Sequence, residues 1–434
     1  IYMLSTQPYK GARDFYPEDK RIQKYMFNVL RSVVEQYGYE EYDSPILESL
    51  DLFKAKSGEE IVNEQTYNFV DRGGRAVAIR PEMTPSVSRM VAGRRQESAY
   101  PLRWYSIPNL WRYERPQKGR LREHWQLNVD VFGIDNETAE LELIQVADSI
   151  FRNFGATPDQ YAIKVNSRKF VDYLFIDYFK LNKEAANKVI KLVDRMHKLE
   201  AIKFESSLRE IVAESKLESV VADEIMEILK VKNLEYLPLP LRSHESLSGV
   251  MSLMKHLENA GITNCFFDIS LMRGFDYYTD IVFEVFDTNP ENGRSIMGGG
   301  RYDGLVGLFG VDPVATVGFG LGDVTLLDFL KVHGLLPKIE VETDAYLVVL
   351  GNNFTYANEV ASELRKQTVN VAIDSSGKKV GSLIKTALKK EIPYVIFVGD
   401  NEAVSKKIVL RRLADSSESE ETVSDAAKLI LESE

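Results

Sequence analysis

The stretch that most constrains the fold runs from residue 103 to residue 133, and its second half alternates with a period of two. Such alternation is typical of a β-strand with one buried face. One face of this strand carries Trp125, Leu127, Val129 and Val131, and the other carries His124, Gln126, Asn128, Asp130 and Phe132. The pattern therefore predicts that Gln126 and Asp130 share a polar face, roughly 13 Å apart along the strand.

A basic turn precedes this strand. Between Arg112 and Arg122 there are five basic residues and one acidic residue, in a chain of net charge -11. Pro116 and Gly119 mark a turn between two strands. A solvated, salt-bridged hairpin would explain the charges. The neighbouring polar strand favours a second interpretation, with an anionic ligand on the arginines and a small polar ligand on the strand.

The run RYERPQKGR followed by HWQLNVDVFG resembles motif 2 of class II aminoacyl-tRNA synthetases, and specifically of histidyl-tRNA synthetases. The resemblance implies an α+β catalytic domain with a mainly antiparallel sheet flanked by helices. It also implies that Gln126 and Asp130 bind histidine and that four residues bind ATP: Arg112, Glu114, Arg120 and His124. Many relatives have an aromatic residue at position 124 that stacks on adenine, and an imidazole can also stack.

Composition excludes several other classes. The length, 434 residues, favours about three domains. The single cysteine, Cys265, excludes an intrachain disulfide framework, and the five histidines have no spacing typical of a metal site, so we expect no metal ligands in the protein. No apolar stretch is long enough to span a membrane and no signal peptide is visible. We therefore expect a cytoplasmic protein, although an organellar protein without its transit peptide would look the same.

The first helix is expected from Pro17 to Tyr37, where Gly38 ends it. An extended segment with Pro45 inside it follows, and proline is tolerated in an edge strand. In the resembled family this helix and strand form motif 1, which builds the homodimer interface. The resemblance places that interface on residues 20–48.

A hairpin with its turn at Gly73 and Gly74 leads to a strand, a corner at Pro81 and a helix. Thr84 is expected to cap this helix. The corner could also present backbone amides and the Glu82 carboxylate to a ligand. It resembles the family's RPE-x-T box, which implies that Glu82, Met83 and Thr84 bind histidine.

Residues 179–240 have a different character. From Lys183 to Lys230 they are nearly all strong helix formers, without glycine or proline. Prolines at 238 and 240 then break the pattern. Composition alone allows a structural bundle or a partner-binding arm. In the resembled family an insertion at this place lies near the tRNA acceptor arm.

The string LMRGFDYYT, residues 271–279, matches a box peculiar to histidyl-tRNA synthetases. An arginine inside such a strand pair should bind a carboxylate or a phosphate. The match implies that Arg273 faces both the α-phosphate and the substrate carboxylate, so that Arg112 and Arg273 are the catalytic pair. It implies that Tyr277 and Tyr278 shape the imidazole pocket.

Two glycine-rich runs follow. Gly298, Gly299 and Gly300 would normally indicate a flexible loop, but they resemble a second histidyl-specific box beside the adenosine, which implies ATP contacts from Gly299 and Gly300. Glycines 318, 320 and 322 stand where motif 3 is expected, and glycine lets the backbone approach a base or sugar closely. The resemblance assigns Gly320 and Gly322 to ATP.

Motif 3 is also where the chain departs from the family. The usual acidic residue and ATP-binding arginine fall on Val324 and Thr325, and no basic residue follows before Lys331. The sequence therefore leaves open how the terminal phosphates of ATP are held.

The boundaries expected from the sequence are a catalytic domain at 1–330 that includes the helical insertion, a linker at 331–343, and a second domain at 344–434. The second domain alternates strand and helix, which favours parallel pairings with helix cover. It resembles the α/β anticodon-binding domain of class IIa synthetases. No glycine-rich phosphate fingerprint follows its first strand, so a dinucleotide site is not expected there.

The resemblance as a whole implies a histidine–tRNA ligase that uses ATP with Mg²⁺, L-histidine and tRNA-His, and works as a homodimer away from membranes. One alternative is a histidine-binding regulatory paralogue without ligase activity. Such paralogues generally lack the anticodon-binding domain and the histidyl boxes that this chain keeps, and the missing motif 3 arginine is the one feature that favours this alternative. A synthetase for glycine, proline or threonine is a second alternative, which the RGFDYY string argues against. A scaffold protein would not explain the polar residues Gln126, Asp130 and Arg273 together.

Overall fold

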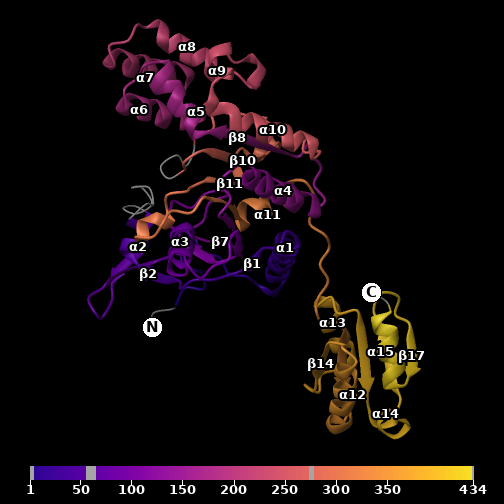
Figure 1. Cartoon of the computed structure of the whole chain (residues 1–434). Helices are drawn as coiled ribbons and strands as arrows, with labels where there is room; N and C mark the ends of the chain where they lie inside the picture. The colour runs from indigo at the N-terminus through magenta and orange to yellow at the C-terminus, as the bar shows by residue number, and fades with distance from the viewer. Residues whose placement is uncertain (1–3, 55–64, 273–277, 433–434) are drawn as a thin grey trace. The chain divides into compact units, whose positions relative to one another are not determined.

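The computed structural model describes residues 4–54, 65–272 and 278–432, and the chain divides into two compact units, residues 1–336 and 337–434 (Figure 1). Arg273 and Tyr277 lie outside the described residues. Within the described ranges, no helix is both long and apolar enough to cross a bilayer.

A nine-stranded sheet organises the first unit, in the order β1-β5-β7-β12-β11-β10-β8-β9, with β6 also paired to β7. Only the pairs β1–β5 and β8–β9 are parallel, so the expected mainly antiparallel sheet is confirmed. The strands are β1 (Glu40–Glu41), β5 (Leu102–Ser106), β6 (Asn109–Trp111), β7 (Glu123–Phe132), β8 (Tyr161–Ser167), β9 (Cys265–Phe267), β10 (Ile281–Asp287), β11 (Ser295–Arg301) and β12 (Thr316–Gly322). A smaller sheet, β2-β4-β3, is formed by β2 (Leu47–Ser49), β3 (Asn68–Val70) and β4 (Ala76–Ile79).

The main core lies between the large sheet and helices α1 (Pro17–Gln36), α4 (Thr138–Asn153) and α11 (Asp323–Val332). Leu127, Val129 and Val131 of β7 point into this core, as their alternation predicts. The prediction of only one buried face is wrong for the second half of β7, where Asn128, Asp130 and Phe132 are buried as well. The reason is that a second apolar cluster covers this other face, where Phe132 packs with Val87, Val91 and Val306.

Two local expectations at the N-terminal side are wrong. Pro45 does not lie in an edge strand but between β1 and β2, which belong to different sheets. The buried Arg80 holds this connection by donating from Nη1 to the Asp43 carboxylate at 2.7 Å and to the Ser44 carbonyl at 2.6 Å. Thr84 does not cap its helix, because it is the first residue of α3 (Thr84–Gly93) and no side chain caps that end.

The glycine run 298–300 lies inside strand β11 and not in a flexible loop. A Cβ atom at Gly299 would lie 2.4 Å from the Gly318 carbonyl oxygen, because β11 and β12 pair there. A side chain larger than hydrogen cannot fit at this position. The glycines therefore serve close packing inside the sheet.

The insertion is helical, as its composition predicts. Its buried residues, including Val189, Leu208 and Ile225, continue the main core of the first unit. The α-helices between strands β8 and β9, which include this region, are α5 (Arg168–Asp172), α6 (Lys183–Asp194), α7 (Ala201–Glu214), α8 (Val220–Leu229), α9 (Leu239–Arg242) and α10 (Ser248–Asn259).

The second unit has a five-stranded sheet in the order β14-β13-β15-β16-β17. Its first three strands are parallel and β16 and β17 are antiparallel, so the predicted alternation of strand and helix is confirmed while the last strand was not foreseen. That strand is exposed and rich in glutamate. The elements are β13 (Ala345–Val349), α12 (Phe354–Lys366), β14 (Val371–Asp374), α13 (Val380–Lys389), β15 (Tyr394–Val398), α14 (Asp400–Ser405), β16 (Ile408–Arg412), β17 (Glu418–Glu421) and α15 (Val423–Leu431).

Candidate functional site

Two adjoining cavities lie over the polar face of β7. The large cavity has a volume of about 370 Å³ and the small cavity about 90 Å³. Both are lined by Glu82, Arg112, Gln126, Tyr278, Gly298 and Gly320. Segments that are far apart in the sequence, from the 81–84 corner to strand β12, therefore meet at one site.

The small cavity is built by facing residues of β7 and β12. Gly318 pairs with Asp130 in the sheet, and a Cβ atom at Gly318 would lie only 2.0 Å from the Asp130 carboxylate. A Cβ atom at Gly320 would lie 2.6 Å from the Gln126 amide nitrogen. Because these glycines have no side chains, there is room for the side chains of Gln126 and Asp130. The two glycines therefore shape the small cavity even without a ligand.

Asp130 is the buried acid of the small cavity. The Tyr302 hydroxyl donates a hydrogen bond to it. Burial raises the pKa of Asp130 to about 7, and the Tyr302 hydrogen bond opposes part of this rise. Tyr302 was not singled out by the sequence. Tyr302 follows Arg301, which comes directly after the glycine run. A tyrosine hydroxyl next to such a constrained strand is the sequence signal that could have indicated a role.

Arg112 links the two cavities. Its Nε donates to the carbonyl of Pro81 at 2.8 Å, which ties the motif 2 strand to the corner that carries Glu82 and Thr84. Glu82 is buried and lines both cavities, and Thr84 lines the small one. A ligand that extends from one cavity into the other would have its anionic centre beside Arg112.

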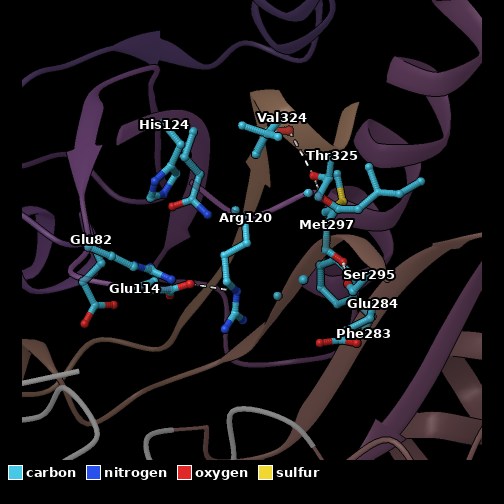
Figure 2. Close-up of a pocket in the computed structure, with 18 of the residues that line it drawn as sticks. Glu82, Glu114, Arg120, His124, Phe283, Glu284, Ser295, Met297, Val324 and Thr325 are labelled. Atoms are coloured by element: carbon cyan, nitrogen blue, oxygen red, sulfur yellow. Dashed lines mark hydrogen bonds and ion pairs between the residues drawn. The ribbon is translucent and has the colours of Figure 1, made fainter. Parts of the chain in front are cut away.

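The large cavity carries most of the residues expected to bind ATP. Arg120 and Glu114 form an ion pair at 2.8 Å, and Figure 2 shows Arg120 extending towards Glu114. His124 lies on the same side of the cavity as Glu114. Burial, and then the charges of Arg112, Arg13 and Arg120, lower the pKa of His124 to about 3. The imidazole is therefore neutral, which suits stacking on a base. Gly299, Gly320 and Gly322 also line this cavity.

Two expected ligand residues line neither cavity. Met83 is fully buried, and its sulfur accepts a long contact of 3.8 Å from the Ser44 hydroxyl. Gly300 lies beneath Tyr278, where a Cβ atom would be 2.8 Å from the Ile281 carbonyl and 3.0 Å from the tyrosine ring. Both residues support the walls of the site from behind.

The lining residues without a predicted role include Asn128, Tyr302 and Glu284. The carboxylates of Glu114 and Glu284 both line the large cavity. Within the ranges described, no group of three or more His, Cys, Asp or Glu side chains could hold a metal. Carboxylate oxygens suit Mg²⁺, which often binds one or two of them together with water and nucleotide phosphates, and Glu114 is paired with Arg120 in this structure.

Comparison with known proteins gives a consistent assignment. Residues 11–324 match the histidyl-tRNA synthetase family, and residues 344–433 match the anticodon binding domain family. The chain is 41% identical to the histidine–tRNA ligase of Leptospira biflexa, covering 99% of this chain and 98% of the relative. It is 35% identical to the chloroplastic/mitochondrial histidine–tRNA ligase of Arabidopsis thaliana, covering 97% of this chain and 86% of the relative.

Solved structures agree on the fold. The histidyl-tRNA synthetase of Nostoc superposes with a TM-score of 0.83 at 21% identity, with both chains covered completely. The apo enzyme of S. aureus superposes with a TM-score of 0.71 at 22% identity, with 98% of this chain and 100% of that chain covered. The chain therefore belongs to the histidyl-tRNA synthetase family.

Proposed function

We infer that this chain is a histidine–tRNA ligase, an enzyme that activates histidine with ATP and transfers it to the 3′ end of tRNA-His. The observation that supports this most directly is the junction of the two cavities at Arg112. The small cavity suits an amino acid with a polar ring, and the large cavity suits a nucleotide.

In the small cavity, Glu82, Thr84 and Gln126 would hold the α-amino end of histidine. Asp130 and Tyr278 would contact the imidazole, and Tyr302 would orient the Asp130 carboxyl group through its hydrogen bond. A buried acid discriminates strongly between ligands, because an amino acid without a ring N–H leaves the acid unpaired. The proposed pocket therefore selects histidine by chemistry as well as by size.

In the first step, a carboxylate oxygen of histidine attacks the α-phosphorus of ATP. A bond forms between that oxygen and phosphorus, and the bond from phosphorus to the bridging oxygen breaks, so that diphosphate leaves. Arg112 would neutralise charge on the α-phosphate, and we assign Arg273 to its other side by family resemblance. Positioning and charge neutralisation dominate such reactions. Removing either arginine should slow adenylate formation at least about 100-fold.

Glu114 and Glu284 would hold Mg²⁺ together with the phosphates of ATP. When bound, the ion would neutralise phosphate charge. In the second step, the terminal ribose hydroxyl of tRNA-His attacks the acyl carbon and AMP leaves. We propose that residues 344–434 bind the anticodon region and that the enzyme works in the cytoplasm.

We also propose that the enzyme is a homodimer formed through the motif 1 region, residues 20–48. Apolar side chains are exposed there and on the neighbouring small sheet, including Ile46, Leu47, Phe69 and Val70. Sedimentation at increasing concentration should show a dimer, and Leu47→Asp should weaken it while Leu388→Asp, an exposed residue of α13, should not. A monomer at all concentrations would refute this proposal.

The deciding experiment is ATP–diphosphate exchange with Mg²⁺ and each of the twenty amino acids in turn. Exchange with histidine alone is expected. Exchange with another amino acid would keep the fold but refute our interpretation of the small cavity. If calorimetry shows histidine binding but no exchange occurs, the regulatory paralogue is favoured instead. The observation that supports this alternative is the uncharged Thr325 in place of the motif 3 arginine.

A further inference from the structure

The arginine that motif 3 normally supplies would stand at position 325. Thr325 has no charge, and its hydroxyl donates to the carbonyls of Ile296 at 3.1 Å and Gly322 at 3.2 Å. Its side chain nevertheless lines the large cavity and also an adjoining cavity of about 450 Å³, which we call the side cavity. A cation that acts in place of the missing arginine should therefore reach this junction.

Arg294 reaches it. Arg294 follows the short turn Pro290–Asn292 and directly precedes β11. A Cβ atom on Gly119, at the tip of the motif 2 turn, would lie 3.5 Å from Cδ of Arg294 and 3.7 Å from Cγ2 of Thr325. The arginine stem and the threonine methyl group therefore both approach Gly119, a residue that lines the large cavity and the side cavity.

The Arg294 guanidinium is available for a ligand. Its side chain is exposed, and among the described residues that side chain makes no hydrogen bond or ion pair. The backbone N–H of Arg294 donates to the Asn292 carbonyl. Lys118 keeps the motif 2 turn close by donating from Nζ to the Glu291 carbonyl at 3.2 Å. The turn that carries Arg294 is therefore attached to the turn that carries Arg120.

Carboxylates are also present in the side cavity. Asp328 Oδ2 would lie 4.0 Å from the same Cβ position on Gly119, and Glu291 is a further lining residue. The side cavity is consequently not uniformly positive. What distinguishes Arg294 is that it lies against Gly119, which lines both the side cavity and the large cavity together with Thr325.

We propose that Arg294 binds the terminal phosphates of ATP, and the diphosphate that leaves, in place of the motif 3 arginine. The proposal rests on the function given above. A guanidinium presents a fork of N–H donors that fits two phosphate oxygens, and it keeps its charge at any physiological pH. An arginine from the turn before β11 would thus do from one side what the family's arginine does from α11.

The test compares four forms of the full chain in ATP–diphosphate exchange: wild type, Arg294→Ala, Arg294→Lys and the double variant Arg294→Ala with Thr325→Arg. Arg411→Ala, in the second unit, is the control. Arg294→Ala should raise KM for ATP and for diphosphate about 10-fold or more, the usual effect of losing a charge-assisted hydrogen bond. The lysine should recover part of this loss, and Thr325→Arg should recover most of it.

Two further measurements exclude a general structural effect. KM for histidine and inhibition by AMP, which lacks the terminal phosphates, should change less than about twofold, since a charge-assisted contact to those phosphates is worth far more. Unchanged KM for ATP and diphosphate in Arg294→Ala would overturn the proposal, as would an equal loss of AMP affinity. If the wild type shows no histidine-dependent exchange, the ligase function itself has failed. ATP binding to wild type and Arg294→Ala, measured by calorimetry, then still tests the role of Arg294.

Discussion

At the scale of single residues, the small cavity, which is the proposed histidine pocket, depends on two residues that have no side chain. The side chains of Asp130 and Gln126 can extend over the neighbouring strand β12 only because Gly318 and Gly320 have no side chains. Asn128, between them on the same face of β7, lines the small cavity as well. The depth of the pocket is therefore set jointly by two strands.

Gly318→Ala should damage histidine binding specifically. The added methyl group would lie 2.0 Å from the Asp130 carboxylate oxygen, so that side chain would have to move. We expect KM for histidine to rise at least about 10-fold, because a misplaced buried polar group loses a hydrogen bond worth more than 1 kcal/mol. KM for ATP should change little. Gly93→Ala, at a glycine with open space around it, is the control. Equal KM values for histidine in both variants would contradict the packing argument.

The pKa of Asp130 makes a prediction about pH. Its folded-state pKa is about 7 against an ordinary value of 3.8, so the folded state retains a proton that the unfolded state releases. The contribution of Asp130 to the free energy of unfolding therefore falls as pH rises from about 4 to about 7. His124 acts in the opposite direction, because its folded pKa is lowered, and its cost to folding grows as pH falls below about 6.5.

Asp130→Asn isolates the first effect. It removes the titrating group and leaves His124 unchanged. The stability of this variant relative to wild type, from urea unfolding at pH 5 and pH 8, should improve on going to the higher pH. A difference that does not depend on pH would show that Asp130 keeps an ordinary pKa.

At the scale of elements, the junction between β12 and α11 is held by one buried carboxylate. Asp323 is the first residue of α11, where a negative charge favours the helix. It accepts from Arg13 at 2.7 Å and from the backbone N–H of Trp125 at 2.9 Å. This residue therefore fastens the N-terminal loop and strand β7 to the helix that follows motif 3.

Asp323→Ala should destabilise the first unit by about 2–3 kcal/mol, since it leaves a partly exposed arginine and a backbone N–H without partners. Tryptophan fluorescence during urea unfolding measures this unit alone, because Trp104, Trp111 and Trp125 all belong to it. The control is Asp223→Ala, which breaks an exposed ion pair with Arg209 and should cost less than about 1 kcal/mol. Equal costs would show that the junction does not depend on Asp323.

Elements also show where the sequence was sufficient. Helix α1 and strand β7 were predicted closely, because each has a regular apolar period and clear turn residues. The strand through Pro45 was predicted wrongly, and the flexible loop that a glycine run normally indicates does not occur at Gly298–Gly300. In both places the outcome depends on distant partners, namely Arg80 for the first and β12 for the second.

At the scale of the whole molecule, the two units have separate cores. The residues of the second core come from β13 to α15, and the large and small cavities are lined by residues of the first unit. Ending the chain after residue 343 should therefore preserve histidine-dependent exchange and reduce charging of tRNA-His by at least about 10-fold, the usual value of a lost binding contact. Loss of exchange in a fragment that retains a cooperative thermal transition would show that the second unit supports the catalytic site.

The sequence by itself determined the class of sheet, the helical insertion, the alternating second unit and part of the lining of the two cavities. These follow from local periodicity, turn residues and motifs that are contiguous in the chain. Only the tertiary structure decided that the polar face of β7 is buried and that Met83 packs behind the site. It also decided that Tyr302 reaches Asp130 across 172 residues and that Arg294 and Thr325 both approach Gly119. Such contacts depend on how strands pair and twist in space, and no local pattern in the chain encodes them.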